Sequence, residues 1–486
     1  MVGITSYGAY IPWYRLQRKS IFQAMGWYAP FTYGIAKGEK AVCNYDEDSL
    51  SMAVNAGMHC LENMKRERIG SFFLASTTLP YQERMNASIV STALDLSPHV
   101  RSADLTGGIK AGTTAMLAAM DGIEAGRCEQ AMVCATDSRL GKPGGTYEHV
   151  FGDAAASFLF GKENVIAEFK GSFSLSYDFV DQRRATGDPF NRNWEERWIR
   201  DAGVSKILPE AFAGATTRFG LDPSQISKLC IALPADMSSM GKKLNLAPDH
   251  FQDPMLGQVG DCGAALAGLM LVAALEDAKP GDHIVVLGFG SGADLLHFEV
   301  TEAIHDLPSR RAVKASLANR MEMDNYEKYT TWRGIQPVEV GIRGEAPAPT
   351  ALSTLWNHRQ VILGMVGSKC MACGTPQFPP QRICANPSCK AVDKMEPYRF
   401  ADRKGKIFTF TGDMLAFSTN PPSIYGLVDM DEGGRLWMDF TDIDIKDMRV
   451  EMPVRLSFRL KYKDDGRGIM GYFWKAIPAE ERKEVQ

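Results

Sequence analysis

The sequence predicts an α/β protein followed by a smaller all-β module, and three observations carry this prediction. Short apolar runs alternate with helical patterns through residues 1–300, which is typical of buried strands separated by helices. Four cysteines then fall within residues 370–389. Beyond them, strand-forming runs are separated by turn residues, as in a small β-barrel or sandwich. We therefore expect two or three domains.

The composition is that of a soluble globular protein, because 45% of the 486 residues are hydrophobic and 23% are charged. The formal net charge of -4 disfavours nucleic acid as a partner. No run of about 18 apolar residues predicts a membrane span, and the N-terminus lacks the basic-then-apolar pattern of a signal peptide. Because most of the ten cysteines are scattered singly, we expect a reducing, cytoplasmic location.

One pattern occurs twice in the first 300 residues. A glycine-rich turn and an alanine-rich helix at 107–126 lead into a strand at 130–137, and residues 257–293 repeat this order up to a strand at 283–288. Internal duplication explains the repeat, although any α/β protein offers strand–turn–helix units. Further strands are expected within 1–16, at 70–77 and at 154–161, and a further helix is expected at 49–64.

Residues 104–115 join an extended segment to a helix through a glycine-rich turn. This is the form of a nucleophile elbow, which places one side chain at a helix N-terminus. Backbone N–H groups there stabilise a thiolate or an oxyanion. Neither Ser nor Cys stands at the apex of this turn, so the elbow lacks the usual nucleophile.

Residues 301–350 are charged and interrupted by Pro and Gly, and they are predicted to form a linker arm. A second domain begins near residue 351 and contains a Cys-x2-Cys and a Cys-x4-Cys pair. Two such pairs predict a closed tetrahedral zinc site that folds the module without catalysis, with a redox dithiol as the alternative. The predicted ligands are Cys370, Cys373, Cys384 and Cys389, and strands are expected at 405–417, 423–443 and 453–463.

Four segments occur in this order: GITSYGAYIPWYRL, GEKAVCNYDEDSLSMAVNAG, GDAAASFLFG and AKPGDHIVVLGFGSGA. Together they resemble the 3-hydroxy-3-methylglutaryl-CoA synthases and, more broadly, the thiolase and ketoacyl-synthase superfamily. Residues 351–480 resemble the zinc-ribbon and OB-fold domain that accompanies such enzymes as an acyl-CoA-binding subunit. The resemblance implies a duplicated, five-layer, thiolase-like α/β fold in 1–300, a zinc ribbon in 351–395, an OB-fold in 396–480, and a homodimer.

Members of this family use a Cys at the elbow, a His and an Asn from the second half and, in the synthases, a Glu. The resemblance places Ile109, Ala232, Asp261 and Thr77 at these positions. An isoleucine can neither attack a thioester nor exchange protons, so a Claisen reaction through an acyl-cysteine is not expected. The retained backbone could still hold a thioester oxygen. Oxyanion and CoA-binding roles are assigned to Ile109, Gly290 and Gly292.

Several residues are candidates for proton transfer in such a site. Asp261 could act as a general base or cap a helix. Glu148 and its neighbour His149 could act as acid or base, or could be structural. Tyr81 and Tyr147 could donate to a developing enolate or alkoxide, although a tyrosine near a turn more often serves packing.

Other residues have a functional and a structural interpretation. Cys262 could be a relocated nucleophile, but a small buried cysteine at a helix start is favoured. Lys110 could form a Schiff base, but an outward-facing lysine is favoured. Arginines in the charged run 178–201 could bind CoA phosphates or could belong to a surface loop or dimer contact. These arginines are Arg183, Arg184 and Arg192.

Two functions of different classes follow. The chain could bind acyl-CoA and make or break a carbon–carbon bond by aldol chemistry, with the elbow stabilising an enolate. It could instead be a non-catalytic acyl-CoA-binding scaffold for a partner thiolase. The family resemblance by itself implies a third function, that of an HMG-CoA synthase or acyltransferase. Acyl-CoA is the expected ligand in each case.

Overall fold

One nine-stranded sheet runs through the first 300 residues of the computed structural model, which describes residues 1–233, 238–341 and 349–479. The strand order is β11-β12-β13-β8-β1-β7-β6-β4-β5. The strands expected in this part are all present. Their bounds are β1 (Gly3–Tyr10), β4 (Ile69–Ala75), β5 (Arg101–Leu105), β6 (Gln130–Asp137), β7 (Ala154–Gly161), β8 (Ala167–Ser176), β11 (Ile226–Ala232), β12 (His283–Phe289) and β13 (Gly292–Val300).

The two halves of this sheet repeat one topology. In the first half, β1 and β7 are antiparallel, as are β7 and β6, whereas β6–β4 and β4–β5 are parallel. In the second half, β8 and β13 are antiparallel, as are β13 and β12, whereas β12 and β11 are parallel. The halves meet where Gly3 and Ile4 of β1 pair with β8. This correspondence confirms the predicted internal duplication.

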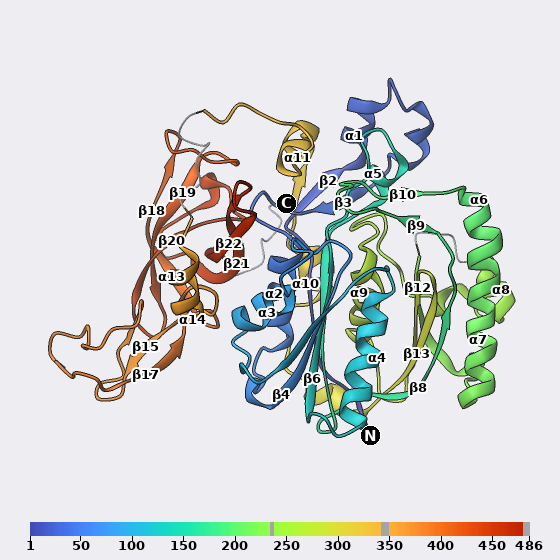
Figure 1. Ribbon diagram of the computed structural model, residues 1–486, viewed down its shortest axis with the longest axis horizontal. Coiled ribbons are helices and arrows are strands. Elements are labelled where there is room, and N and C mark those ends of the chain that lie inside the picture. The colour runs from blue at the N-terminus through green and yellow to red at the C-terminus, as the bar shows by residue number, and fades with distance from the viewer. Residues whose placement is uncertain (234–237, 342–348, 480–486) are drawn as a thin grey trace.

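Helices form three layers around the two halves of the sheet (Figure 1). The pair α2 and α3 covers one outer face, and α7, with α8 beside it, covers the other. Between the half-sheets lie α4 and α9, which contact each other. This five-layer order confirms the predicted fold class. The bounds are α2 (Ser49–Cys60), α3 (Asn86–Ala93), α4 (Ala111–Glu124), α7 (Ser205–Phe219), α8 (Ser238–Leu244) and α9 (Leu266–Leu275).

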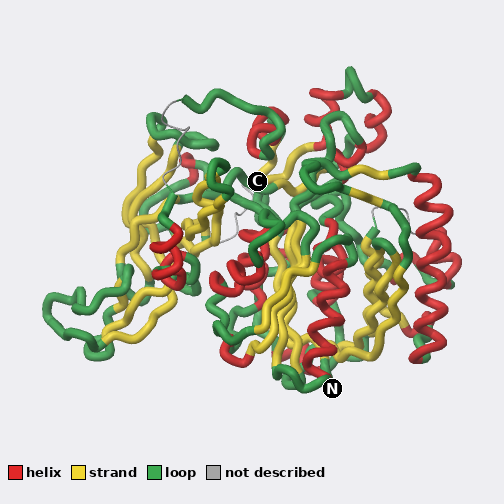
Figure 2. The backbone as a smooth tube through the Cα atoms, viewed as in Figure 1, coloured by secondary structure: helices red, strands yellow, loops and turns green. Residues whose placement is uncertain are grey.

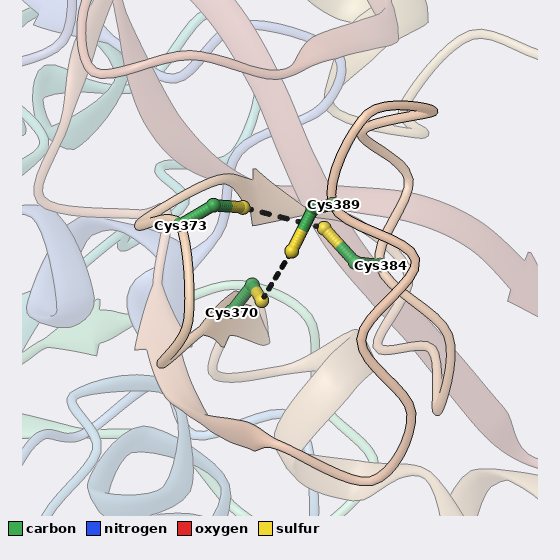
Figure 3. A group of neighbouring side chains, drawn as sticks. All are labelled: Cys370, Cys373, Cys384 and Cys389. Atoms are coloured by element: carbon green, nitrogen blue, oxygen red, sulfur yellow. Dashed lines mark hydrogen bonds between the residues drawn. The ribbon is translucent and has the colours of Figure 1, made fainter.

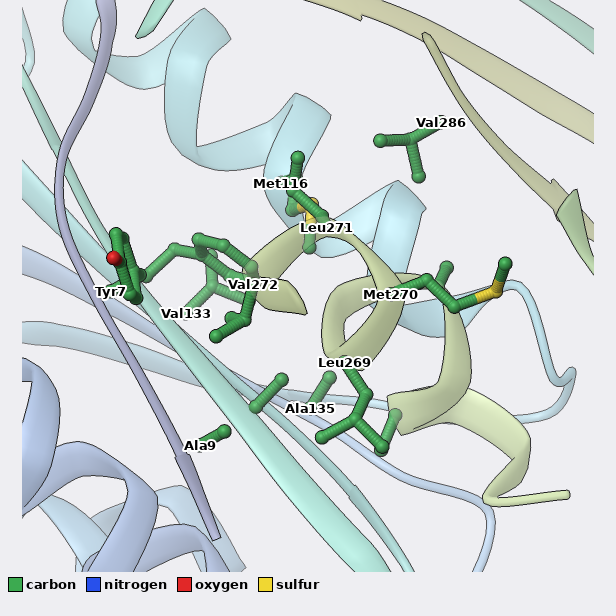
Figure 4. Close-up of a cluster of buried hydrophobic side chains, with 14 of the residues drawn as sticks. Tyr7, Ala9, Met116, Val133, Ala135, Leu269, Met270, Leu271, Val272 and Val286 are labelled. Carbon is green, nitrogen blue, oxygen red and sulfur yellow. The ribbon is translucent and has the colours of Figure 1, made fainter. Parts of the chain in front are cut away.

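The central helix α9 is buried along its whole length. None of its ten residues is polar, and a helix without a polar face belongs in a core. Figure 4 shows Val272 of α9 near Val133 and Leu269 near Ala135, both residues of the first half-sheet. Gly112 of α4 allows the close contact between halves, because a Cβ there would lie 2.3 Å from the Ala264 carbonyl oxygen. Among the described residues, no helix is long and apolar enough to cross a membrane.

Part of the predicted linker arm folds against the first domain. After α10 (Val313–Ala318), β14 (Met321–Met323) pairs in parallel with β2 (Tyr14–Gln17), which also pairs with β3 (Glu39–Val42). After α11 (Tyr326–Trp332), Nη1 of Arg333 lies 2.8 Å from Oδ2 of Asp153. The described residues of 301–341 thus add elements to the first domain, and the boundaries at 300 and 350 stay a prediction.

The C-terminal part consists mainly of strands (Figure 2), and the strands of its two sheets pair antiparallel. A small sheet of order β16-β15-β17 carries the cysteine-rich loops, and a larger sheet has the order β20-β19-β18-β21-β22. This arrangement confirms the predicted all-β module. Its strands are β15 (Val366–Cys370), β16 (Pro376–Gln377), β17 (Met395–Arg399), β18 (Lys404–Asp413), β19 (Ser423–Met430), β20 (Arg435–Asp439), β21 (Pro453–Asp464) and β22 (Ile469–Pro478).

A buried cluster of charges joins the two parts of the chain. The guanidinium of Arg459, on β21, is fully buried, and its Nη1 lies 2.7 Å from a carboxylate oxygen of Glu47 and 3.3 Å from one of Asp46. Its Nη2 contacts Asp442, and Nζ of Lys475 lies 2.8 Å from Asp46. Because residues 46 and 47 precede α2, these ion pairs attach the C-terminal sheet to the first domain.

Arg459→Leu is expected to destabilise the protein, because it leaves the carboxylates of Asp46, Glu47 and Asp442 buried without their main cation. Breaking a buried ion pair in this way costs about 3–5 kcal/mol, so the midpoint of urea unfolding, followed by circular dichroism, should fall. Lys461→Leu removes an exposed charge from the same strand and should leave the midpoint nearly unchanged. A wild-type midpoint for Arg459→Leu would contradict this account.

Candidate active site

A cavity of about 820 Å³ lies where the two halves of the first domain meet. Ala232 and Phe289 line it from the ends of β11 and β12, and Ile109 and Gly263 line it from the turns before α4 and α9. Strand carboxyl ends and the helix N-termini beside them commonly form binding sites in α/β proteins. The predicted elbow, which joins β5 to α4, therefore forms one wall of a cavity.

The elbow presents the backbone of Ile109 beside the second glycine-rich loop. No backbone carbonyl of the described residues accepts the Ile109 N–H. Gly290 has a φ of +154°, and a Cβ there would lie 2.7 Å from Cγ1 of Ile109. The Gly290 N–H already donates to the Gly292 carbonyl, with the nitrogen 3.0 Å from the oxygen. At Gly292, a Cβ would lie 2.1 Å from the Leu175 carbonyl oxygen, so this glycine serves sheet packing and does not line the cavity.

Asp261 lines the cavity and is paired with a buried arginine. Its Oδ1 lies 2.7 Å from Nη2 of Arg139 and accepts from the Gly263 N–H at 2.9 Å. Its Oδ2 is buried and has no hydrogen-bond partner among the described residues. Burial acts to lower the pKa of Arg139, but the carboxylates of Asp261 and Asp137 outweigh burial and raise this pKa. Asp261 is therefore a fixed carboxylate with one unpaired oxygen.

Besides the exposed Glu196, two other acidic groups line the same cavity. Asp181, between β8 and α7, is 7% exposed. Burial raises its pKa, although hydrogen bonds from backbone N–H groups act to lower it. Tyr147, on α5 (Thr146–Val150), stacks on Phe151 with ring centroids 4.4 Å apart. Burial also raises the pKa of the Tyr147 phenol. A carboxyl and a phenol that bind their protons more tightly than usual suit proton transfer.

The basic residues at the cavity differ from those that the sequence suggested. Arg197, Arg200 and Lys243 line it. The arginines expected to bind CoA phosphates do not line it and bond to other parts of the protein instead; Arg184, for example, also donates to the Thr77 carbonyl. Arg183 donates to the Asn193 carbonyl, Arg184 donates to the Asp188 carbonyl, and Arg192 pairs with the Asp188 carboxylate.

The four cysteines of the second domain form one compact group. Their sulfur atoms all lie within 4.8 Å of one another, with 3.8 Å between Cys370 and Cys389 and 3.5 Å between Cys373 and Cys384. Figure 3 shows the four side chains pointing toward one another from two facing loops. Thiolates about 2.3 Å from a tetrahedral ion would lie about 3.8 Å apart. The donor set and spacing fit one metal ion.

Known proteins resemble both the first domain and the C-terminal domain of this chain. The hydroxymethylglutaryl-CoA synthase of Methanococcoides burtonii is 30% identical over 348 residues, which cover 68% of this chain and 98% of the relative. That of Methanocaldococcus jannaschii is 29% identical over 343 residues, which cover 68% of this chain and 99% of the relative. This chain belongs to the hydroxymethylglutaryl-CoA synthase family. The family described as ChsH2, C-terminal OB-fold domain, matches residues 398–459.

Solved structures with a similar fold support this family assignment at the level of the fold. An HMG-CoA synthase complexed with CoA has a TM-score of 0.60 and 19% identity, and the match covers 72% of this chain and 94% of that chain. Cerulenin-bound OleA of Xanthomonas campestris has a TM-score of 0.55 and 20% identity, and the match covers 62% of this chain and 96% of that chain. The thiolase-like fold of the synthase family and the OB-fold of the C-terminal sheet are both supported.

The positions that family resemblance assigned to Cys, His and Asn converge in the structure. Ile109, Ala232 and Asp261 all line the one cavity. Thr77, at the position of the synthase Glu, does not line it, and its Oγ1 donates to Oδ2 of Asp137 at 2.9 Å. Three of the four positions inferred from synthase-like motifs are therefore brought together.

Glu148 and Tyr81 lie outside the cavity. The carboxylate of Glu148 accepts from the Gly144 N–H at 2.8 Å and from the Tyr326 hydroxyl at 2.7 Å, so it holds α11 in place. The Tyr81 hydroxyl accepts from the Met470 N–H of β22 at 2.8 Å, so it lies where the two domains touch. The structure does not bring either residue to Asp261.

The remaining candidates also have structural partners. Cys262 is fully buried, its Sγ lies 3.4 Å from the Gly260 carbonyl oxygen, and burial raises its pKa, as the favoured structural interpretation requires. The expectation of an outward-facing Lys110 is wrong, because its Nζ lies 3.0 Å from Oδ1 of Asp294 in the other half. His149 is buried, does not line the cavity, and has a pKa that burial lowers to about 4.

Besides these basic residues, sequence reasoning missed Asp181 and Arg139 in the cavity region. Asp181 lies in the charged run 178–201, in which the sequence points only to arginines as ligand-binding residues. Arg139 lies two residues after β6, at a strand end where functional residues often gather. A search for charged residues just after each apolar strand could have found Arg139, whereas nothing in the local sequence marks Asp181.

Proposed function

We propose that this chain binds a CoA thioester in the cavity and makes or breaks a carbon–carbon bond beside the thioester by aldol chemistry, without an acyl-enzyme. The observation that carries the proposal is the set of side chains at the cavity. Ile109 stands at the elbow, and Asp181 and Tyr147 supply acidic groups. None of the described residues that line it is Cys or His. Membership of the synthase family supports a CoA thioester as the ligand.

In the cleavage direction, Asp181 accepts the hydroxyl proton of a 3-hydroxyacyl-CoA. The bond between the α and β carbons breaks, the β carbon becomes a carbonyl, and the electron pair moves into the thioester as an enolate. The Ile109 N–H donates to the enolate oxygen, since a preorganised donor stabilises charge as it develops. Asp181 then returns the proton to the α carbon. The products are a shorter acyl-CoA and an aldehyde or ketone.

The cations of the cavity suit the other end of this ligand. Arg197, Arg200 and Lys243 line the cavity, and Arg and Lys side chains are the common partners of phosphate groups. We assign the CoA phosphates to these three residues. Asp261, paired with Arg139, orients the polar end of the acyl group through its carboxylate, whose Oδ2 has no hydrogen-bond partner among the described residues.

Asp181→Asn is expected to lower turnover of a 3-hydroxyacyl-CoA by at least about 100-fold, because general acid–base catalysis contributes on this scale. Release of the shorter acyl-CoA, measured by liquid chromatography, gives the rate. Acyl-CoA affinity, measured by calorimetry, should change little. Asp188→Asn, in the same segment but not lining the cavity, should keep the wild-type rate. Equal rates for Asp181→Asn and wild type would exclude the role of Asp181.

A second candidate function is an acyl-CoA-binding scaffold for a partner thiolase. It is favoured by apolar residues exposed on the C-terminal domain, where Met414, Leu415 and Trp437 are 71%, 86% and 65% exposed, as at protein-binding surfaces. Cleavage by the purified chain alone would exclude this candidate. Synthase chemistry through an acyl-cysteine is disfavoured, because none of the described residues that line the cavity is a cysteine. We infer a homodimer in the cytoplasm from the family relationship and the scattered cysteines.

We also propose that the four-cysteine group binds zinc. Four thiolates in a tetrahedron leave no open position, which is typical of structural zinc. The role of the ion would be to hold the loops that carry Cys370, Cys373, Cys384 and Cys389, because the small sheet of β15, β16 and β17 has little core of its own.

Removal of the metal should destabilise the second domain selectively. Cys384→Ser is expected to lower zinc content from one ion per chain, measured by mass spectrometry of the metal, to well below one, and to lower the melting temperature. Cys128→Ser changes a cysteine of the first domain outside this group and should keep the metal. Wild-type protein that purifies without zinc and resists zinc loading would contradict the proposal.

A further inference from the structure

A groove of about 870 Å³ runs between the two domains, away from the cavity described above. It is lined by residues 58–66 at the end of α2, by residues 309–318 around α10, and by residues of the C-terminal domain at 401–404 and 455–456. It shares no lining residue with the cavity at Ile109. The groove is therefore a separate feature that the proposed function leaves unexplained.

Basic side chains outnumber acidic ones along the groove. Some are neutralised: Nη2 of Arg66 lies 2.8 Å from Asp402, and Arg403 pairs with Glu432 at 2.5 Å. Two carboxylates also line it, and Glu276 accepts from the Lys314 N–H at 3.1 Å. What distinguishes the groove is the positive charge that remains after these pairs are formed.

Arg455 is the clearest source of this remaining positive charge. The side chain is half-buried, and its Nε is buried without a hydrogen-bond partner among the described residues. Burial and the nearby Arg311 lower its pKa to about 9. The carboxylate of Asp442 acts to raise this pKa but does not outweigh burial and Arg311. A partly buried guanidinium whose Nε lacks an acceptor is costly, so an anion bound at this site would be stabilised.

Arg310 reinforces the charge from the other wall. Its Nη1 donates to the carbonyls of Cys60 and Tyr7 at 3.2 and 3.4 Å, and its Nη2 is buried without a partner among the described residues. Neutral acceptors fix the side chain but leave its charge uncompensated. Arg310 and Arg455 thus place two such guanidinium groups on the first and the second domain, across one groove.

We infer that this interdomain groove binds a small molecule that carries a diphosphate group, with Arg455 as its principal contact. A guanidinium pairs with phosphate oxygens through two parallel hydrogen bonds. The groove has the size of ordinary small-molecule sites, so it can hold more than a single inorganic ion. Because its walls come from both domains, an anion bound there would bridge them.

The test is calorimetry of the full chain with pyrophosphate and with ADP, in the absence of any CoA thioester, because CoA itself carries a diphosphate group and would compete for the groove. Both probes should bind, and Arg455→Gln should weaken each by at least about tenfold, the loss expected for one charge-assisted contact. Lys463→Gln, which removes an exposed charge from the same strand, should keep wild-type affinity. Arg455→Lys, which keeps the charge, should bind more tightly than Arg455→Gln.

A second measurement, the melting temperature, tests whether the Arg455→Gln variant still folds. Without ligand, Arg455→Gln should melt at or above the wild-type temperature, because removing a partly buried charge whose Nε has no acceptor relieves its desolvation cost. Tighter binding of ADP than of pyrophosphate would identify a nucleotide as the ligand class, and equal binding would identify the diphosphate group alone. Absence of binding by both probes, or equal affinity in Arg455→Gln and wild type, would overturn the inference while leaving the proposed reaction untouched.

Discussion

The placement of the two domains depends on the buried guanidinium of Arg459. It forms ion pairs with the carboxylates of residues 46 and 47, which follow β3, and these pairs attach the OB sheet to the first domain. The N–H groups of Glu39 and Ala41 in β3 donate to the carbonyls of Gly257 and Val259, in the turn that leads to Asp261. The interdomain ion pairs and the cavity carboxylate therefore belong to one continuous set of contacts. The C-terminal domain is part of the support of the site.

Duplication explains why the site lies where it does. Two copies of a turn–helix–strand unit meet through α4 and α9, and the turn before each helix faces the same cavity. Charged pairs link the copies, since Lys110 of the first copy meets Asp294 of the second, and Arg139 meets Asp261. Each elbow is held by the opposite half, so the backbone geometry of the elbow can persist when its apex residue is isoleucine.

Much of the fold could be predicted from the sequence, because buried strands, alanine-rich helices and paired cysteines leave local patterns. The site could be predicted only at the positions that the family motifs cover, which are Ile109, Ala232 and Asp261. Glu148 and Tyr81 were misplaced because their partners, Tyr326 and Met470, lie far along the chain. Asp181 was missed for the same reason: its position depends on how the segment between β8 and α7 folds over the cavity, and no local spacing records that.

The central claim is that the cavity holds a CoA thioester without a cysteine nucleophile. A crystal structure with a non-cleavable oxoalkyl-CoA, in which a ketone replaces the thioester, tests it most directly. We expect the ketone oxygen to accept from the Ile109 N–H, the Asp181 carboxyl to face the acyl group, and the phosphates to contact Arg197, Arg200 or Lys243. CoA bound outside this cavity, or an acyl group attached to a cysteine after soaking with acyl-CoA, would contradict the account.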